Sequence, residues 1–259
     1  MAGKYQAPRK NTPGCRPKGG DPIREKRRKI ITIALAVLFF LLALGLTVYP
    51  IFSSRYNEVH QSQIHTEYQD AVQALPDTAV PEARAKALAY NEELWSSIVQ
   101  HGSYSKDSVS SAVEEYAQLL DLTGTGTMGY VHIPKLGVSL PIYHGTEEET
   151  LDRGIGHLIG SSLPVGGDST HAILTGHSGL ASQKMFSDLD KLEMGDTFYL
   201  EVLNEVLAYE VDQINTVLPH DTTYLGLEEG KDLCTLVTCT PFGVNTHRLL
   251  VRGHRIPYT

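Results

Sequence analysis

Hydrophobic and polar residues follow three different patterns along this 259-residue chain. Residues 30–52 are almost entirely apolar and carry no charge, with Thr32, Gly45, Thr47 and Pro50 as the main interruptions. A helix that rises about 1.5 Å per residue needs roughly twenty such residues to span a hydrocarbon core of about 30 Å. Ala, Glu, Gln and Leu dominate much of residues 53–127, which favours helices. From residue 128 onward, short β-branched stretches alternate with turn residues, a pattern typical of strands.

This pattern predicts specific helices and strands. Helices are expected over Ser54–Leu75, Pro81–Gln100 and Ser108–Leu120. Strands are expected over Met128–Ile133, Ser139–Tyr143, His171–Thr175, Thr197–Val202, Val206–Val217, Thr235–Cys239 and Arg248–Ile256, with a hairpin turn at Leu203-Asn204-Glu205. Several short strands at this spacing favour an all-β barrel or sandwich over alternating β-α units.

Charge is distributed unevenly. The first 29 residues hold ten Lys/Arg and two Asp/Glu, although the whole chain has a net charge of −8, so the remainder is strongly acidic. An acidic body argues against nucleic acid as its partner, whereas the basic tail could contact anionic lipid headgroups. The tail is rich in Gly and Pro and is expected to be disordered.

The basic cluster directly before the apolar run predicts a cytoplasmic N-terminus and an extracytoplasmic body. The run exceeds the length of an ordinary signal-peptide core, and no small-x-small cleavage site follows closely, which favours an uncleaved anchor over a cleaved signal. The expected organisation is a basic cytoplasmic tail (1–29), a single transmembrane anchor (30–52), a helical region (53–127) and a β domain (128–259).

The exported part contains two cysteines that cannot pair with each other. Cys234 and Cys239 lie five residues apart on one predicted strand, about 16 Å at roughly 3.3 Å per residue, whereas a disulfide needs Cα atoms within about 7 Å. Cys15 lies in the tail, across the membrane. Unpaired thiols are unusual in exported proteins, and a leftover thiol there is a candidate nucleophile.

Cys239 is the better candidate of the two. A cysteine in an apolar strand is more often a small buried hydrophobe, and Cys234, which has no cationic neighbour in sequence, fits that interpretation. Cys239 instead ends its strand beside a loop, and Arg248 follows on the returning strand. His177, between two glycines at another strand end, would supply the base, and the glycines would leave room for a substrate backbone. No phosphate loop, dinucleotide fingerprint or zinc-type spacing is present, so neither a cofactor nor a metal is expected.

Several ordered motifs resemble the sortases, and most closely the pilus-assembling class C sortases. The family's Thr-Leu-x-Thr-Cys signature corresponds to Thr235-Leu236-Val237-Thr238-Cys239, and the longer class C form continues to Gly253. Further matching segments are Gly129–Lys135, Leu140–Thr146, Gly156–Leu158, Ser162–Gly167 and Phe186–Leu189. The resemblance covers about residues 85–257. It implies a closed eight-stranded sortase β-barrel on a Gram-positive cell surface.

The resemblance also implies roles. Cys239 is expected to be the nucleophile, His177 the general acid/base, and Arg248 the group that holds the substrate carbonyl or oxyanion. The substrates would be pilin or surface proteins with an LPXTG-like sorting motif, cleaved between Thr and Gly and joined to a pilin lysine. Alternatives are anchoring to a cell-wall precursor amine, accessory-pilin incorporation, simple peptide hydrolysis or a non-catalytic scaffold. His144 and His157 are expected to be structural.

The chain departs from class C sortases in one respect that affects the active site. Many of them carry a lid with an Asp-Pro-aromatic tripeptide, but residues 91–127 contain no such motif. The only Asp-Pro, Asp21-Pro22, lies in the tail. A lid over the site is therefore not expected from this motif. The exact sorting motif, the pilin and the acceptor lysine stay open.

Overall fold

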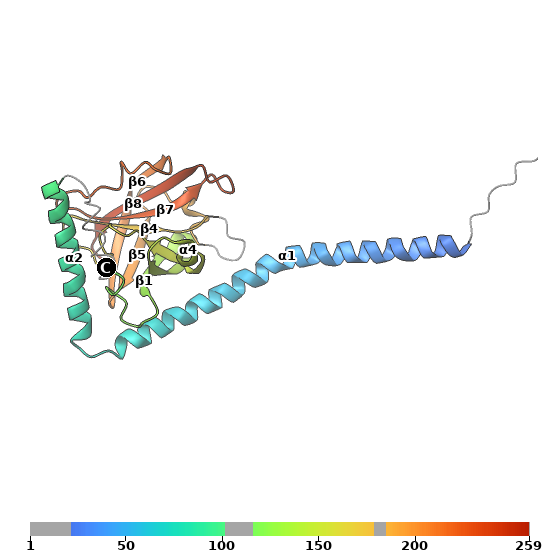
Figure 1. Cartoon of the computed structure of the whole chain (residues 1–259), viewed down its shortest axis with the longest axis horizontal. Coiled ribbons are helices and arrows are strands. Elements are labelled where there is room, and N and C mark those ends of the chain that lie inside the picture. The colour runs from blue at the N-terminus through green and yellow to red at the C-terminus, as the bar shows by residue number, and fades with distance from the viewer. Residues whose placement is uncertain (1–21, 102–115, 179–184, 259) are drawn as a thin grey trace, which may run out of the picture. The chain divides into compact units, whose positions relative to one another are not determined.

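The computed structural model describes residues 22–101, 116–178 and 185–258. Contacts divide the chain into two units, residues 1–49 and residues 50–259. The first unit holds most of the apolar run, and the second holds the β domain with the helical segments that pack on it (Figure 1). The predicted helix over Ser108–Leu120 lies largely outside the described residues, as does the tail up to residue 21.

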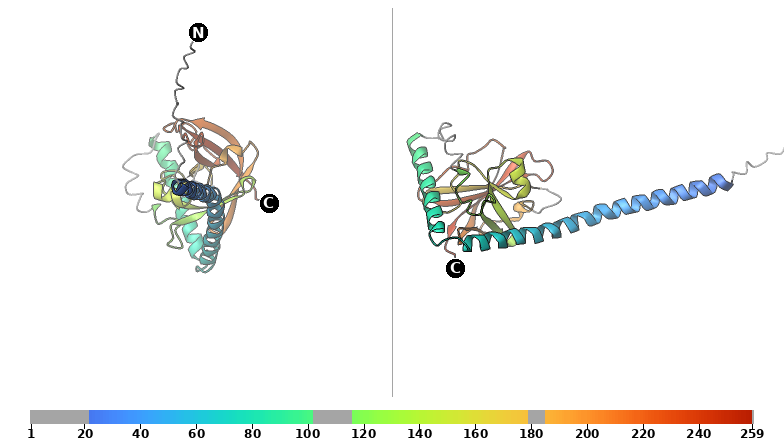
Figure 2. Two further views of the ribbon diagram at one scale, coloured as in Figure 1. Left: turned by 90° about the vertical axis from the view of Figure 1, so that its right-hand side faces the viewer. Right: turned by 60° about the horizontal axis from the view of Figure 1, so that its bottom comes forward.

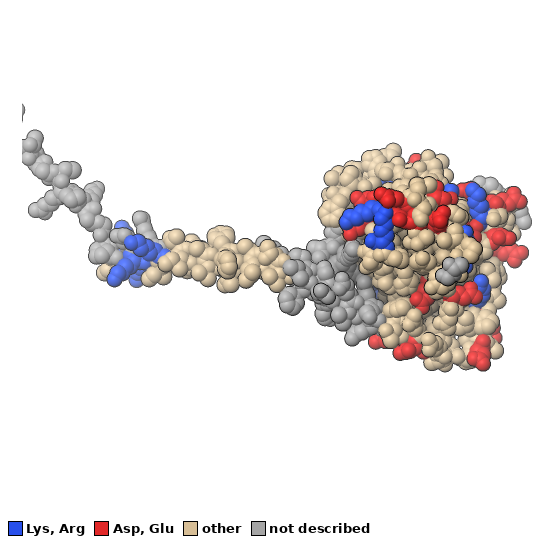
Figure 3. All heavy atoms as spheres, turned by 180° about the vertical axis from the view of Figure 1, so that it is seen from behind, with Lys and Arg blue, Asp and Glu red and all other residues tan. Residues whose placement is uncertain are grey.

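Helix α1 (Pro22–Gln73) begins earlier than expected. Residues 22–29 were predicted to be part of a disordered tail, but they are helical. Pro22 suits the first turn of a helix, and the Arg, Glu and Lys residues after it are good helix formers. Figure 3 shows these basic side chains, followed by an uncharged stretch in which Phe39 and Phe40 are exposed. Among the residues that the structure describes, none of the helices is both long and apolar enough to cross a membrane.

Eight strands form a closed barrel, which confirms the predicted mainly β fold with an eight-stranded barrel. The strands are β1 (Thr127–Ile133), β2 (Val138–His144), β3 (Ile155–His157), β4 (Thr170–Thr175), β5 (Thr197–Val202), β6 (Glu205–Val217), β7 (Asp232–Thr240) and β8 (His247–Ile256). Their order around the barrel is β1-β2-β3-β4-β7-β8-β6-β5, and β5 pairs with β1 to close it. Two pairs, β2 with β3 and β4 with β7, are parallel, and the others are antiparallel.

One long helix and three short helical elements cover or connect the strands among the described residues. They are α2 (Ala79–His101), η1 (Pro134–Leu136), α4 (Glu148–Arg153) and η2 (Leu189–Lys191). Helix α2 lies along the barrel (Figures 1 and 2), where Ala83 and Ala87 join the core. The Asn91 side chain bonds both the backbone N–H and the carbonyl oxygen of Leu163. These two bonds fix α2 to the loop between β3 and β4.

The hairpin between β5 and β6 turns where the sequence predicts it. Val202 pairs with Glu205, so Leu203 and Asn204 form a two-residue loop. Both have positive φ, 54° and 60°, as a type I′ turn requires. Leu203 is an unusual residue for this conformation, but its side chain is buried in the core. Core packing therefore offsets the backbone strain of a non-glycine residue at that position.

Side chains of β4, β7 and β8 alternate between the barrel interior and its outer face. Leu174, Leu236 and Val251 belong to the main core. On the opposite face, their sequence neighbours Ile173, Val237 and Leu250 form a separate buried cluster with Val217 of β6, and Leu158 and Leu225 pack against it. We call this set the outer apolar cluster. The outer side of these strands therefore carries a second, buried apolar layer and not the polar side chains usual for an exposed sheet face.

Candidate active site

Cys239 lies near the end of β7, directly opposite Arg248 of β8 in the antiparallel register. Cys239 is two residues from Val237, and Arg248 is two residues from Leu250, so both share the face of the outer apolar cluster. Cys234 is fully buried on the interior side. Both thiols are free, as the spacing predicted, and only Cys239 is partly exposed. The strand geometry therefore distinguishes an accessible thiol from a core thiol.

The segment that carries His177 continues alongside β7 beyond the end of β4. The last paired residues are Thr175 and Val237. Beyond them, the N–H of Gly176 donates to the Val237 carbonyl (3.0 Å), and the Thr238 hydroxyl donates to the Gly176 carbonyl (2.8 Å). The Ser178 hydroxyl then donates to the Cys239 carbonyl (2.7 Å). These bonds bring the backbone on either side of His177 next to the Cys239 end of β7.

His177 and Arg248 each have contacts of their own. A carboxylate oxygen of Asp152, on α4, lies 3.8 Å from Nε2 of His177. Nη1 of Arg248 donates to the carbonyl oxygens of Asn245 (3.3 Å) and His247 (3.1 Å). These bonds leave Nε and Nη2 of Arg248 uncommitted within the part of the chain that the structure describes. The guanidinium is thus attached to its own loop and still has donors for another group.

One depression is lined by Cys239, and a second, larger one lies next to the outer apolar cluster. A small pocket of about 30 Å³ beside Cys239 is lined in part by Ser178, Thr238 and the exposed Phe242. A larger apolar one of about 370 Å³ is lined by Ile173 of the outer apolar cluster, by Leu158 to Ser161 and by residues of the β6–β7 loop, among them Leu225. An extended peptide with small and apolar side chains fits such a surface better than a charged one.

One expectation about the glycines beside His177 is wrong for Gly176. A Cβ atom on Gly176 would lie 2.6 Å from Cδ1 of Ile155 and 2.8 Å from Cδ2 of Phe186. Both of these side chains belong to the core. Gly176 is therefore needed for close packing inside the barrel and not to give room to a substrate. Gly179, the second glycine, lies outside the described residues.

The environment of His157 agrees with its expected structural role. The ring is fully buried, and it is hydrogen-bonded to the Tyr116 hydroxyl through Nδ1 (2.9 Å) and to the Ser162 carbonyl through Nε2 (2.8 Å). Burial lowers its pKa to about 4. His144 likewise bonds the Leu119 carbonyl through Nε2 (2.7 Å). Both rings are therefore held by hydrogen bonds to other parts of the chain.

Two residues of the site were missed from sequence. Ser178 holds the Cys239 carbonyl, and Asp152 lies near His177. Ser178 directly follows His177, but no local pattern indicates a partner on another strand. Asp152 is one of several acidic residues in a short helix. Only its position across the fold distinguishes it from its neighbours.

Comparisons with known proteins agree on one family. Residues 131–256 match the sortase domain. The chain is 30% identical over 160 residues to sortase D of Bacillus subtilis (strain 168), covering 61% of this chain and 77% of that protein. The crystal structure of sortase C1 from Streptococcus agalactiae is 46% identical with a TM-score of 0.69, and the match covers 76% of this chain and all of the other.

Sortase C of Clostridium perfringens, solved with the C-terminal cell wall sorting motif, is 39% identical with a TM-score of 0.64. That match covers 76% of this chain and all of the other. With its closed eight-stranded barrel and these relatives, the chain belongs to the sortase family of cysteine transpeptidases and is most like the class C sortases.

Proposed function

We propose that this protein cleaves an LPXTG-like sorting motif between Thr and Gly and joins the Thr carbonyl carbon to a pilin lysine. The observation that carries the proposal is the position of Cys239 between Arg248 and the segment with His177, on one outer face of the barrel. A nucleophile, a proton donor and a fixed cation are the groups that acyl transfer through a thiol needs. The relatives support the same class of reaction and substrate.

In the first step the Cys239 thiolate attacks the Thr carbonyl carbon. A C–S bond forms, the C–N bond to Gly breaks, and His177 gives a proton to the departing Gly amine. Arg248 donates to the carbonyl oxygen, where negative charge develops. The uncommitted Nε and Nη2 of Arg248 suit this role. The product is a thioester between Cys239 and the shortened substrate.

In the second step a lysine amine attacks the thioester. His177 removes a proton from the amine, the new C–N bond forms, and the C–S bond breaks to return the Cys239 thiolate. Water competes with the amine, so an apolar surface beside the thioester favours joining over hydrolysis. The exposed Phe242, which lines the small pocket beside Cys239, supplies such a surface.

The test mixes the purified full chain, kept in detergent, with pilin subunits that carry an LPXTG-like motif. SDS-resistant ladders with Thr–lysine isopeptide links found by mass spectrometry are expected. Cys239→Ala should abolish both cleavage and ladders, whereas Cys234→Ala, on the interior side of the same strand, should retain them. Joining by Cys239→Ala would refute the assigned nucleophile.

The same assay distinguishes the other reactions. Cleavage without ladders that is rescued by a cell-wall precursor amine would indicate anchoring instead of polymerisation. Cleavage that added amines leave unchanged would indicate a peptidase. Arg248→Lys should be severely impaired, because an ammonium cannot reproduce the planar fork of the guanidinium. Arg84→Lys, on α2, is the matched control and should behave like the wild type.

We also propose that residues 30–52 anchor the protein in the cytoplasmic membrane, with residues 1–29 inside and the barrel outside the cell. The support is the uncharged run itself and the basic cluster before it. The run includes Leu46 and residues 49–52, whose side chains are outside the structural description. Membrane fractionation, with protease added to intact protoplasts, tests this. Recovery of the barrel in the soluble fraction would refute it.

A further inference from the structure

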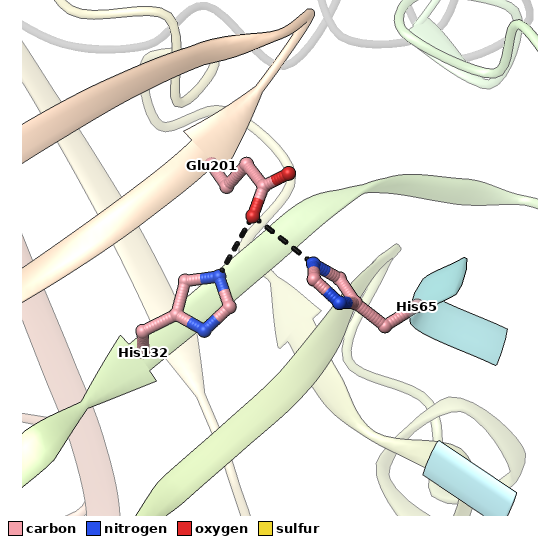
Figure 4. Close-up of side chains that lie close together, drawn as sticks. All are labelled: His65, His132 and Glu201. Atoms are coloured by element: carbon pink, nitrogen blue, oxygen red, sulfur yellow. Dashed lines mark hydrogen bonds and ion pairs between the residues drawn. The ribbon is translucent and has the colours of Figure 1, made fainter. Parts of the chain in front are cut away.

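A second cluster of ionisable side chains joins α1 to the barrel. His65 comes from α1, His132 from β1 and Glu201 from β5 (Figure 4). Nε2 of His65 lies 3.0 Å, and Nε2 of His132 lies 3.1 Å, from the same oxygen, Oε2 of Glu201. One ligand atom from each of the three residues lies within 4.8 Å of the other two. Two imidazole nitrogens and a carboxylate oxygen therefore converge on one point.

The fold holds these residues in place. In the β1–β5 pair, Tyr130 is opposite Glu201 and His132 is opposite Tyr199, so His132 and Glu201 are diagonal neighbours. On α1, the Tyr68 hydroxyl donates to the Met128 carbonyl (3.3 Å), and Tyr68 packs with Tyr130. The His65 ring makes an edge contact with Tyr130 at 4.5 Å between centroids. Packing on both sides thus orders the histidines before any ligand binds.

A further residue orients the carboxylate. Gln69, one turn after His65, donates to Oε1 of Glu201 (2.8 Å), which leaves Oε2 directed at the two histidines. The side chains are 16–26% exposed, so solvent and ions can reach them.

We infer that His65, His132 and Glu201 bind a divalent zinc ion, with water in the fourth position. Zinc favours imidazole and carboxylate ligands at about 2.0–2.2 Å in tetrahedral geometry, whereas Mg²⁺ and Ca²⁺ prefer oxygen ligands alone. Tetrahedral bonds of that length put neighbouring ligand atoms about 3.3 Å apart. The two nitrogen–oxygen distances need to lengthen by only a few tenths of an ångström. Gln69 would act as the outer partner that fixes the ligating carboxylate.

The ion would have a structural role. Strands β1 and β5 lie on the opposite side of the closed barrel from β7, which carries Cys239. An ion there joins α1 to two strands that are distant in sequence, and it stabilises the folded state by an amount that rises with the logarithm of its concentration above Kd. The competing arrangement is a metal-free hydrogen-bonded cluster in which both histidines donate Nε2–H to Glu201. The two differ in whether the ring nitrogens are available to a metal.

The test is zinc binding to the metal-stripped, untagged full chain in detergent. Cys15→Ser and Cys239→Ala are introduced first, because both thiols could bind zinc themselves. Calorimetric titration with Zn²⁺ should give one site per chain, and zinc should raise the unfolding temperature. His65→Gln and His132→Gln should each weaken binding at least tenfold. His220→Gln, which alters an exposed histidine far along the chain, should leave it unchanged.

A second measurement does not depend on the variants folding. Chemical modification of histidines by diethyl pyrocarbonate, read by mass spectrometry, should slow at His65 and His132 when Zn²⁺ is added and stay the same at His220. Loss of binding in both variants together with this protection establishes the site. Absence of saturable binding, or binding that survives both substitutions without protection of His65 and His132, would refute it and leave the hydrogen-bonded cluster.

Discussion

Gly176→Ala tests whether His177, the proposed acid/base group, is positioned by packing inside the barrel. The added methyl group would lie 2.6 Å from Cδ1 of Ile155 and 2.8–3.0 Å from the Phe186 ring. Overpacking of this kind costs about 1–3 kcal/mol. Gly176 does not have a positive φ, so alanine meets no backbone strain and even gains about 0.4–1 kcal/mol through the unfolded state. We expect a net loss of about 1–2 kcal/mol in the free energy of unfolding.

The assay is urea unfolding of the full chain, combined with the rate of sorting-motif cleavage. Gly226→Ala is the matched control, since a Cβ atom there would have no heavy atom within 4 Å and φ is not positive. Its stability should be unchanged or slightly raised. The backbone of Gly176 is hydrogen-bonded to Val237 and Thr238 and directly precedes His177. Gly176→Ala should therefore also slow cleavage, because the methyl group displaces this backbone.

A second substitution identifies the contact responsible. Ile155→Val removes Cδ1, the atom closest to the new methyl group, and alone should cost about 0.5–1.5 kcal/mol. In the double variant the two losses should be less than additive, by about 1 kcal/mol, and cleavage should partly recover. Strict additivity, or a Gly176→Ala protein as stable as Gly226→Ala, would refute the packing explanation.

Three further predictions concern single residues. Because burial holds the pKa of His157 at about 4 while the unfolded chain takes up a proton near pH 6.5, acid favours unfolding. Between pH 7 and pH 5, the free energy of unfolding should fall by about 2 kcal/mol more in the wild type than in His157→Gln, measured by urea unfolding. An equal fall in both proteins would contradict this. Asp152→Asn should lower kcat less than about fivefold, since an exposed pair at 3.8 Å contributes at most about 1 kcal/mol. The Arg252 guanidinium bonds both Glu228 (2.6 Å), in the β6–β7 loop, and Asp212 (2.9 Å), and the same loop lines the larger pocket. Arg252→Lys should therefore raise KM for the sorting motif about fivefold with little change in kcat. An unchanged KM would contradict this.

Local pattern predicted most of the barrel, because its longer strands carry enough alternating residues to show a period of two. The exception is β3, which was not predicted. It has only three residues, Ile155–His157, all of them buried, with a glycine in the middle. Such a segment shows neither alternation nor strong strand propensity. It becomes a strand because β2 pairs with it on one side and β4 on the other.

The candidate site was only partly predictable for a related reason. Cys239 and Arg248 come from strands joined by a short loop, so their proximity follows from a hairpin and could be inferred locally. The segment with His177 lies beside the Cys239 end of β7 because of the parallel β4–β7 pair, whose strands are separated by β5 and β6 in the sequence. Before the structure, only the resemblance to sortases indicated that His177 belongs to the same site as Cys239 and Arg248. The cluster of His65, His132 and Glu201 had no motif at all, since its members lie far apart in the chain.

The surroundings of each histidine decide what it can do. Burial of His171 lowers its pKa, and its two nitrogens are occupied by the Gly226 carbonyl (2.8 Å) and the Thr235 hydroxyl (2.7 Å). His157 is held in the same way, and burial disfavours the charged form of its ring too. His177 is 30% exposed and has a carboxylate near Nε2 that is itself open to solvent. A residue that must give a proton to one amine and take one from another needs this access. Accessibility therefore favours His177 as the acid/base group over these two buried histidines, independently of the family resemblance.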